Sequence, residues 1–250
     1  MARQLDEQIA GRFPVGRRLR VLDVGMGRGT QALRLARAGH QVTGVEQDAQ
    51  LIATARGELA GEPEGIRERV RIVQGDGRDT GVHFLPGSFD VVLCHGVLMY
   101  VEEPDPLLAG LARMLAPGGL LSLLVRNGDA PAMRPGLGGD WAAALAAFDT
   151  TAHLPHARTE ANGATHARPG LEGRADRLAE LTATLAGIGA PLHAWYGVRV
   201  FTDTAFTDTA ADEERAQADL TTLLAVEERA GKTDPYRSVA ALLHLCGVRG

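Results

Sequence analysis

Short apolar runs alternate with stretches of helical periodicity along the first half of the chain. The apolar runs predict five strands, at Leu19–Val24, Gln41–Val45, Val70–Gln74, Phe89–Cys94 and Leu120–Val125. Apolar residues three and four positions apart predict helices between them, at Thr30–Arg37, Ala49–Ala60 and Pro106–Leu115. Strands that alternate with helices of about this length are typical of a doubly wound, mostly parallel sheet. The pattern therefore predicts an α/β fold of the Rossmann-like kind.

The alternation stops after Val125 and returns only near residue 178. Residues 127–173 hold several Pro and Gly and one helix-like stretch, Trp141–Phe148. A long segment without alternating elements inside a compact domain is more often functional than a plain loop. The last elements predicted are a helix at Leu178–Leu185, strands at His193–Thr202 and Ala240–Val248, and an acidic helical face within Asp203–Asp234. We expect one domain over residues 1–250, with a seven-stranded sheet and an acceptor-side cap at 127–173.

Composition narrows the class of protein. The chain has 250 residues, 45% of them hydrophobic and 23% charged, which excludes a disordered protein or a coiled coil. Two cysteines, Cys94 and Cys246, are too few for a disulfide scaffold. No apolar run is long enough to span a membrane, and the first residues lack the apolar core of a signal peptide. We therefore expect a cytoplasmic protein with no membrane partner, and its net charge of −5 gives no general attraction to nucleic acid.

A glycine-rich loop follows the first predicted strand. Gly25, Gly27 and Gly29 alternate there, and Asp23 precedes them. Such glycines let the backbone turn sharply at the carboxyl end of a strand, where open α/β sheets bind ligands. A dinucleotide fingerprint needs a sixth-position glycine, which is Thr30 here, and a P-loop lysine is also absent. The missing glycine and lysine therefore weigh against a dinucleotide-dependent oxidoreductase.

The pattern D-x-G-x-G-x-G resembles the first motif of class I S-adenosylmethionine (SAM)-dependent methyltransferases. Further residues agree with it, since Glu46 ends the second strand, GDGRD follows the third and PGG precedes the fifth. The resemblance implies SAM as methyl donor and S-adenosylhomocysteine (SAH) as product. It also implies the donor-binding residues, which are Asp23, Gly25, Gly27, Gly29, Glu46, Gln47, Asp76, Gly77, His95 and Tyr100. In that family the acidic residue at Glu46 binds the ribose hydroxyls, and the Asp76–Gly77 position holds the adenine.

Several longer stretches are similar to one branch of that family, the bacterial tRNA 5-carboxymethoxyuridine methyltransferases (the SmtA-like branch). They include CHGVLMYVEEP, LAPGGLLSLLVRN, GVRVFTD and LLAVEERAGKTDPY. The resemblance runs over roughly residues 20–245 and implies methylation of a carboxylate on a modified wobble uridine of tRNA. In that family, Arg126 and Asn127 match positions on the acceptor side.

Three residues are candidates for acceptor chemistry. His95, at the end of the fourth strand, is a candidate general base, with lining of the site as the alternative. Arg199 is expected on one face of a strand with Trp195 and Phe201, where its guanidinium would clamp an anionic acceptor, or else pair with Asp203. Asn127 is the third candidate. A carboxylate acceptor is already ionised and needs no base, whereas a hydroxyl does.

The acceptor itself stays open between alternatives. The acidic chain and a cap with few basic residues favour O-methylation of a small molecule, with a carboxylate as one candidate group, over methylation of tRNA. A non-catalytic SAM-binding protein is the alternative of another class. His153, His156 and His166 lack a cysteine or carboxylate framework, so we expect no metal. Few residues precede the first strand, so we expect a second copy of the chain to complete the lid in a homodimer.

Overall fold

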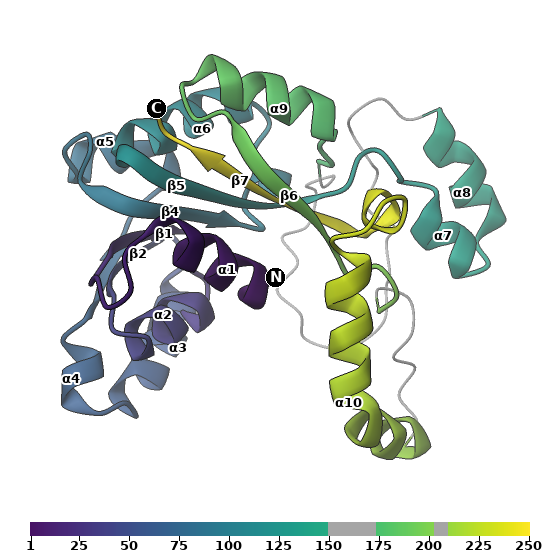
Figure 1. Cartoon of the computed structure of the whole chain (residues 1–250), viewed down its shortest axis with the longest axis horizontal. Coiled ribbons are helices and arrows are strands. Elements are labelled where there is room, and N and C mark those ends of the chain that lie inside the picture. Colours follow the sequence, from purple (N-terminus) through teal and green to yellow (C-terminus); the bar gives the residue numbers. More distant parts are fainter. Residues whose placement is uncertain (150–173, 203–209) are drawn as a thin grey trace.

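A single mixed sheet organises the chain in a computed structural model that describes residues 1–149, 174–202 and 210–250, with the backbone alone for 210–219. Its strand order is β3-β2-β1-β4-β5-β7-β6 (Figure 1). The strands are β1 (Arg20–Val24), β2 (Gln41–Glu46), β3 (Val70–Gln74), β4 (Phe89–His95), β5 (Leu115–Arg126), β6 (Leu192–Val198) and β7 (Leu242–Val248). The first five are parallel, and β7 runs antiparallel between β5 and β6. The predicted mostly parallel, doubly wound sheet is confirmed.

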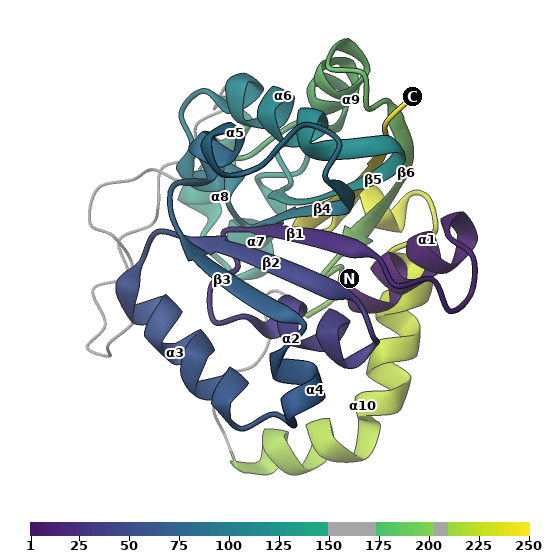
Figure 2. The ribbon, with the colours of Figure 1, turned by 90° about the vertical axis from the view of Figure 1, so that its left-hand side faces the viewer.

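Helices cover both faces of the sheet, and Figures 1 and 2 agree on their sides. One face carries α5 (Thr80–His83), α6 (Pro104–Met114) and α9 (Leu178–Gly187). The other carries α1 (Ala2–Arg12), α2 (Thr30–Arg37), α3 (Ala49–Ala60), α4 (Glu64–Arg67) and α10 (Ala210–Ala230). Two further helices, α7 (Met133–Leu137) and α8 (Trp141–Phe148), lie beyond the carboxyl end of β5 (Figure 1). None of the helices in the described ranges is long and apolar enough to cross a membrane.

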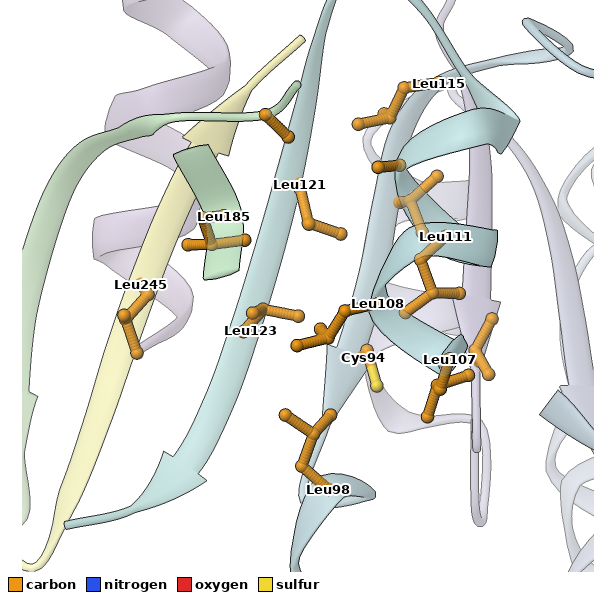
Figure 3. Close-up of a cluster of buried hydrophobic side chains, with 14 of the residues drawn as sticks. Cys94, Leu98, Leu107, Leu108, Leu111, Leu115, Leu121, Leu123, Leu185 and Leu245 are labelled. Atoms are coloured by element: carbon orange, nitrogen blue, oxygen red, sulfur yellow. The ribbon is translucent and has the colours of Figure 1, made fainter. Parts of the chain in front are cut away.

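Leucines fill the space between the sheet and α6 (Figure 3). Leu108 and Leu111 of α6 are fully buried against Leu121 and Leu123 of β5. Burying a leucine side chain contributes roughly 1.5–3 kcal/mol, so this layer fixes the strands that end at the ligand edge. Cys94 points into the same layer (Figure 3), and burial raises the pKa of its thiol, which fits an inert core residue.

Several strand and helix boundaries differ from the predicted ones. The fifth strand begins at Leu115, because PGG continues the pairing and Gly118 N donates to Arg249 O at 2.8 Å. The sixth strand ends at Val198 and not at Thr202, and the seventh begins at Leu242. Helix α1 was missed, because only Gln4 and Leu5 of this polar segment are buried. The helices α7 and α8 fall in the predicted cap, whose residues 150–173 lie outside the described ranges.

Candidate functional site

The loops that follow β1 to β4 meet at one edge of the sheet, where the parallel strands end. In the first of them, Gly25 has a φ of 68° and Gly27 a φ of 58°, in the left-handed region that favours glycine. A Cβ at Gly25 would lie 2.3 Å from Cγ2 of Val97, whereas a Cβ at Gly27 would meet nothing within 4 Å. The loop therefore packs closely on the chain at Gly25 and leaves its backbone open to a ligand at Gly27.

Glu46 ends β2 with its carboxylate on this loop. Its Oε2 accepts a hydrogen bond from Gly27 N at 3.0 Å. Its Oε1 accepts from Gln47 N at 2.9 Å and from Asp48 N at 3.0 Å. A carboxylate has about four acceptor positions, so the backbone leaves about one, on Oε2, for a ligand hydroxyl. The structure thus brings the predicted Glu46, Gln47 and Gly27 together, with Gln47 contributing its backbone.

Asp23 lies on β1, the strand that pairs with β2, and its side chain is buried. Burial raises the pKa of this carboxyl to about 7, and the nearby negative charge of Glu46 adds to the shift. Two acidic side chains this close favour a cationic ligand, because a positive charge between them would relieve the repulsion.

We expect Asp23 to make the folded state less stable as pH rises from about 4 to about 7. Over this range the folded protein keeps the Asp23 proton and the unfolded chain has lost it, so the free energy of unfolding falls with pH. Urea unfolding at several pH values checks this. The fall should be smaller in Asp23→Asn than in the wild type, and identical slopes in the two proteins would contradict a raised pKa.

Asp76 and Gly77 follow β3. Asp76 accepts from Arg78 N at 2.9 Å, and its two oxygens also bind the Arg78 guanidinium, with Nη2 at 2.6 Å. The Arg78 side chain is 69% exposed, so it can turn away when a ligand approaches. A Cβ at Gly77 would lie 2.5 Å from Cγ1 of Val24, so the backbone of this loop packs tightly on the end of β1.

His95 is the last residue of β4, and its Nε2 lies 2.9 Å from Ser122 Oγ. Burial lowers the pKa of His95 to about 4, and the positive charges of Arg34 and of the N-terminal amine act in the same direction. The ring is therefore neutral near pH 7. Tyr100, in the short helix η2 (Leu98–Tyr100) that follows, is 54% exposed at the same edge.

Asn127 stands directly after β5, as predicted, but its side chain is engaged with the backbone. Its Nδ2 donates to Ser238 O at 2.9 Å and to Ala240 O at 2.8 Å, and its Oδ1 accepts from Asp129 N at 2.9 Å. Both hydrogens of the amide are therefore used by the backbone, while Oδ1 keeps one lone pair, so the acceptor-side role of Asn127 stays a prediction. Asn127 holds the end of β5 to the segment that enters β7.

Arg199 does not lie on a strand face, so that prediction is wrong. It follows the end of β6 with a φ of 58°, in a turn whose next three amides, Val200 N, Phe201 N and Thr202 N, all donate to the Glu227 carboxylate at 2.9 Å. Trp195 is not its aromatic frame, because that ring stacks on the Arg237 guanidinium at 3.9 Å. Since β6 and β5 run in the same direction, Arg199 still lies at the ligand edge.

Two residues that the sequence did not indicate close this edge. The Asp176 side chain is buried, and its Oδ1 accepts from Arg174 Nε at 2.6 Å. Asp176 also forms a β-bridge with Asn127, and Arg174 N donates to Met99 O. They therefore tie the loop after β4 to the end of β5, although no motif marks them.

The three histidines considered for a metal, His153, His156 and His166, lie outside the described residues. Within the described ranges, no group of His, Cys, Asp and Glu could hold a metal ion.

Comparison with known proteins finds similarity to methyltransferases. Residues 22–123 match the family model of the methyltransferase domain. The tRNA 5-carboxymethoxyuridine methyltransferase of Escherichia coli K12 is 37% identical over 49% of this chain and 45% of its own length. A ubiquinone biosynthesis O-methyltransferase of Xanthomonas campestris is 35% identical over 43% of each chain. The chain thus spans less than half the length of these curated relatives.

Solved structures resemble the whole chain at low sequence identity. A SAM-dependent methyltransferase of Methanosarcina mazei has a TM-score of 0.64 at 16% identity, covering 97% of this chain and 96% of that one. The magnesium protoporphyrin IX methyltransferase of Synechocystis, solved with bound SAH, has a TM-score of 0.55 at 17% identity, covering 99% of this chain and 83% of that one. These likenesses establish the fold.

Proposed function

We propose that this chain, which carries a class I SAM-dependent methyltransferase domain, transfers the methyl group of SAM to an oxygen atom of a small-molecule acceptor. The observation that carries the proposal is the Glu46 carboxylate bound to Gly27 N, beside a loop whose backbone is open to a ligand. The Glu46 carboxylate can accept a hydrogen bond from a ribose hydroxyl, and the accessible backbone of the loop lets a nucleoside approach. Bound SAM supplies an electrophilic methyl group on a positively charged sulfur.

The residues at the edge divide the binding of the donor among them. Glu46 accepts a hydrogen bond from the ribose, and Asp76 binds the adenine once Arg78 turns away. The negative charge of Glu46 favours the cationic end of the donor, and that positive charge would in turn favour loss of the proton from Asp23, whose pKa is raised to about 7. Tyr100 and His95 lie beside the methionine part. Once the donor is held by these residues, alignment of the acceptor oxygen with the methyl carbon can lower the barrier to methyl transfer by roughly 7–11 kcal/mol.

A small acceptor fits the charges at this edge better than tRNA does. The chain has a net charge of −5. Arg174 pairs with the buried Asp176 at 2.6 Å, and Arg237 pairs with Asp234 at 2.7 Å, so these two guanidinium groups are already engaged. Binding of RNA relies on several basic groups that reach phosphates. We assign Arg199 to an anionic part of a small acceptor because it follows the end of β6, at the same edge of the sheet as the donor loops.

Two other functions remain candidates. Methylation of a modified wobble uridine in tRNA is favoured by the similarity to the tRNA 5-carboxymethoxyuridine methyltransferase. A SAM-binding protein without activity would keep Glu46 and Asp76 and turn over no acceptor.

Methyl-labelled SAM distinguishes these functions. The purified protein is incubated with it and an extract of the source cells, with and without ribonuclease, and the products are separated by size. We expect label in small molecules that resist ribonuclease. Label in RNA that disappears with ribonuclease would replace the small acceptor by tRNA, and binding without any labelled product would favour the inactive protein.

Arg78→Ala is expected to change SAH affinity by no more than about fivefold. Solvent screens the ion pair between the exposed Arg78 and Asp76, so removing the Arg78 side chain should change the affinity of Asp76 for a ligand only slightly. Asp76→Ala, in contrast, should weaken SAH by about tenfold, because a hydrogen bond to the adenine is lost. Calorimetric titration measures both. A large loss of affinity in Arg78→Ala would mean that Arg78 itself contacts the donor.

A further inference from the structure

A chain of hydrogen-bonded polar side chains runs through the apolar layer on the α1 side of the sheet. His95 Nε2 lies 2.9 Å from Ser122 Oγ, which lies 2.8 Å from His244 Nε2. His244 Nδ1 lies 3.1 Å from Oε1 of Gln4 on α1. Ser122, His244 and Gln4 are all buried, so none of them exchanges these partners for water. We call these four residues the histidine relay.

The direction of every hydrogen bond in the relay follows from its far end. Gln4 Nε2 lies 3.3 Å from Gly197 O, which can only accept, so the Gln4 amide nitrogen faces Gly197 and its oxygen faces His244. His244 Nδ1 must then carry a proton. Burial lowers the pKa of His244 well below its ordinary value, so this ring is neutral and its Nε2 is bare.

The tautomer of His95 follows from that of His244. The single hydroxyl proton of Ser122 goes to the bare His244 Nε2, so Ser122 Oγ can only accept from His95 Nε2–H. A neutral His95 with its proton on Nε2 has a bare Nδ1. That atom is buried and has no hydrogen-bond partner among the described residues. The relay thus leaves an unused acceptor nitrogen at the end of β4.

The groups that face His95 from neighbouring elements are Arg34 on α2, the amine of Met1 before α1, and His244 on β7. The positive charges of the first two disfavour a charged His95 ring. Arg34 also leaves its Nη2 buried without a partner in the described ranges, while its Nε binds Gln31 and its Nη1 binds Asp6. A bare ring nitrogen suits a hydroxyl, which has a proton to donate, whereas an ionised carboxylate would turn its own lone pairs toward Nδ1.

We propose that His95 Nδ1 takes the proton from a hydroxyl group of the methyl acceptor, and that Ser122, His244 and Gln4 are positioning residues that hold the required tautomer. This inference rests on the proposed function and names its substrate class, an alcohol or phenol in place of a carboxylic acid. As the oxygen forms its bond to the methyl carbon, the O–H bond breaks and its proton moves to Nδ1. The electron pair of the C–S bond stays on sulfur, and the imidazolium then releases the proton to water.

The tautomer can be measured on the protein alone, without donor or acceptor. In protein with ¹⁵N-labelled histidine, long-range ¹H–¹⁵N spectra at pH 6 should show His95 with its proton on Nε2 and His244 with its proton on Nδ1. Ser122→Ala should give a mixture of His95 tautomers, and Ser122→Thr, which keeps the hydroxyl, should restore the single form. A charged His95, a proton on its Nδ1, or an unchanged tautomer in Ser122→Ala would overturn the relay.

The linkage of the transferred methyl group tests the substrate class. Small-molecule products labelled from SAM in the extract are treated with alkali, which releases methanol from a methyl ester and leaves a methyl ether intact. We expect an alkali-stable ether. An ester would overturn the hydroxyl assignment while leaving the proposed function in place, whereas the absence of any labelled small molecule would overturn the proposed function and the role of Nδ1 with it.

Kinetics on the same labelled product separate catalysis from folding. His95→Ala should lower kcat by about a hundredfold or more, in the range of general base catalysis. Ser122→Ala should lower kcat by about tenfold with the KM for SAM unchanged, and Ser122→Thr should recover most of it. If Ser122→Ala instead raises the KM for SAM, and Ser122→Thr does not restore activity, the histidine relay has only a structural role.

Discussion

Glu46→Ala is expected to weaken SAH binding by about ten- to a hundredfold. The carboxylate has one acceptor position left after its three backbone hydrogen bonds, and a charge-assisted bond to a ribose hydroxyl contributes roughly 1.5–3 kcal/mol. Each 1.4 kcal/mol is a factor of ten in the dissociation constant. The variant also removes the partner of Gly27 N, so the loop loses part of its ordering before the ligand arrives. Calorimetric titration with SAH measures the change directly.

A matched control is Glu62→Ala, which removes the same side chain from an ion pair with Arg37, beyond the C-terminal end of α3. It should bind SAH like the wild type. Thermal unfolding of both variants tests whether the loss is local, since an unfolded Glu46→Ala would lose binding for a trivial reason. A folded Glu46→Ala with wild-type affinity would remove Glu46 from the donor site.

Arg199→Ala is expected to lower kcat/KM for the acceptor by about ten- to a hundredfold while SAH affinity changes less than threefold. Two charge-assisted hydrogen bonds from one guanidinium to an anionic group are among the strongest side-chain contacts, and their loss acts on the acceptor alone. Arg199→Lys should recover only part of the activity, because an ammonium group keeps the charge but lacks the planar pair of donors. The assay is methyl transfer from labelled SAM to the extracted small molecules.

Arg71→Ala provides the control for this prediction, since Arg71 is exposed on β3 at the far side of the sheet. It should leave both constants unchanged. Equal losses of acceptor turnover and SAH affinity in Arg199→Ala would indicate that the turn held by Glu227 has come apart, and the acceptor role of Arg199 would be lost.

The first half of the fold could be predicted because the central parallel strands β1 and β4, which are buried on both faces, are continuous apolar runs. At the ligand edge, Gly25 follows β1 and Glu46 ends β2. The loop from Asp23 to Gly29 and Glu46 could be found because each is recognised from the few residues around the end of one strand. What could not be predicted depends on partners distant in sequence. The left-handed backbone at Arg199 follows from a carboxylate, Glu227, far along the chain, and β6 ends early for the same reason.

The acceptor side shows the same limit. Asn127 was found by its position after β5, but its amide is directed by Ser238 and Ala240, which no local pattern connects to it. Ser122 and His244 look like single polar interruptions in apolar strands. Only the sheet order, with β5 between β4 and β7, brings them into line with His95.

The measurement that most directly tests the donor site is backbone hydrogen–deuterium exchange with and without saturating SAH. We expect slower exchange in peptides that contain Gly25–Gly29, Gln47–Asp48 and Gly77. At the opposite edge of the sheet, where Asp90 binds Arg20, exchange should not change. Protection at the Asp90 edge, or none in the glycine loop at saturation, would contradict the placement of the donor at the carboxyl ends of the strands.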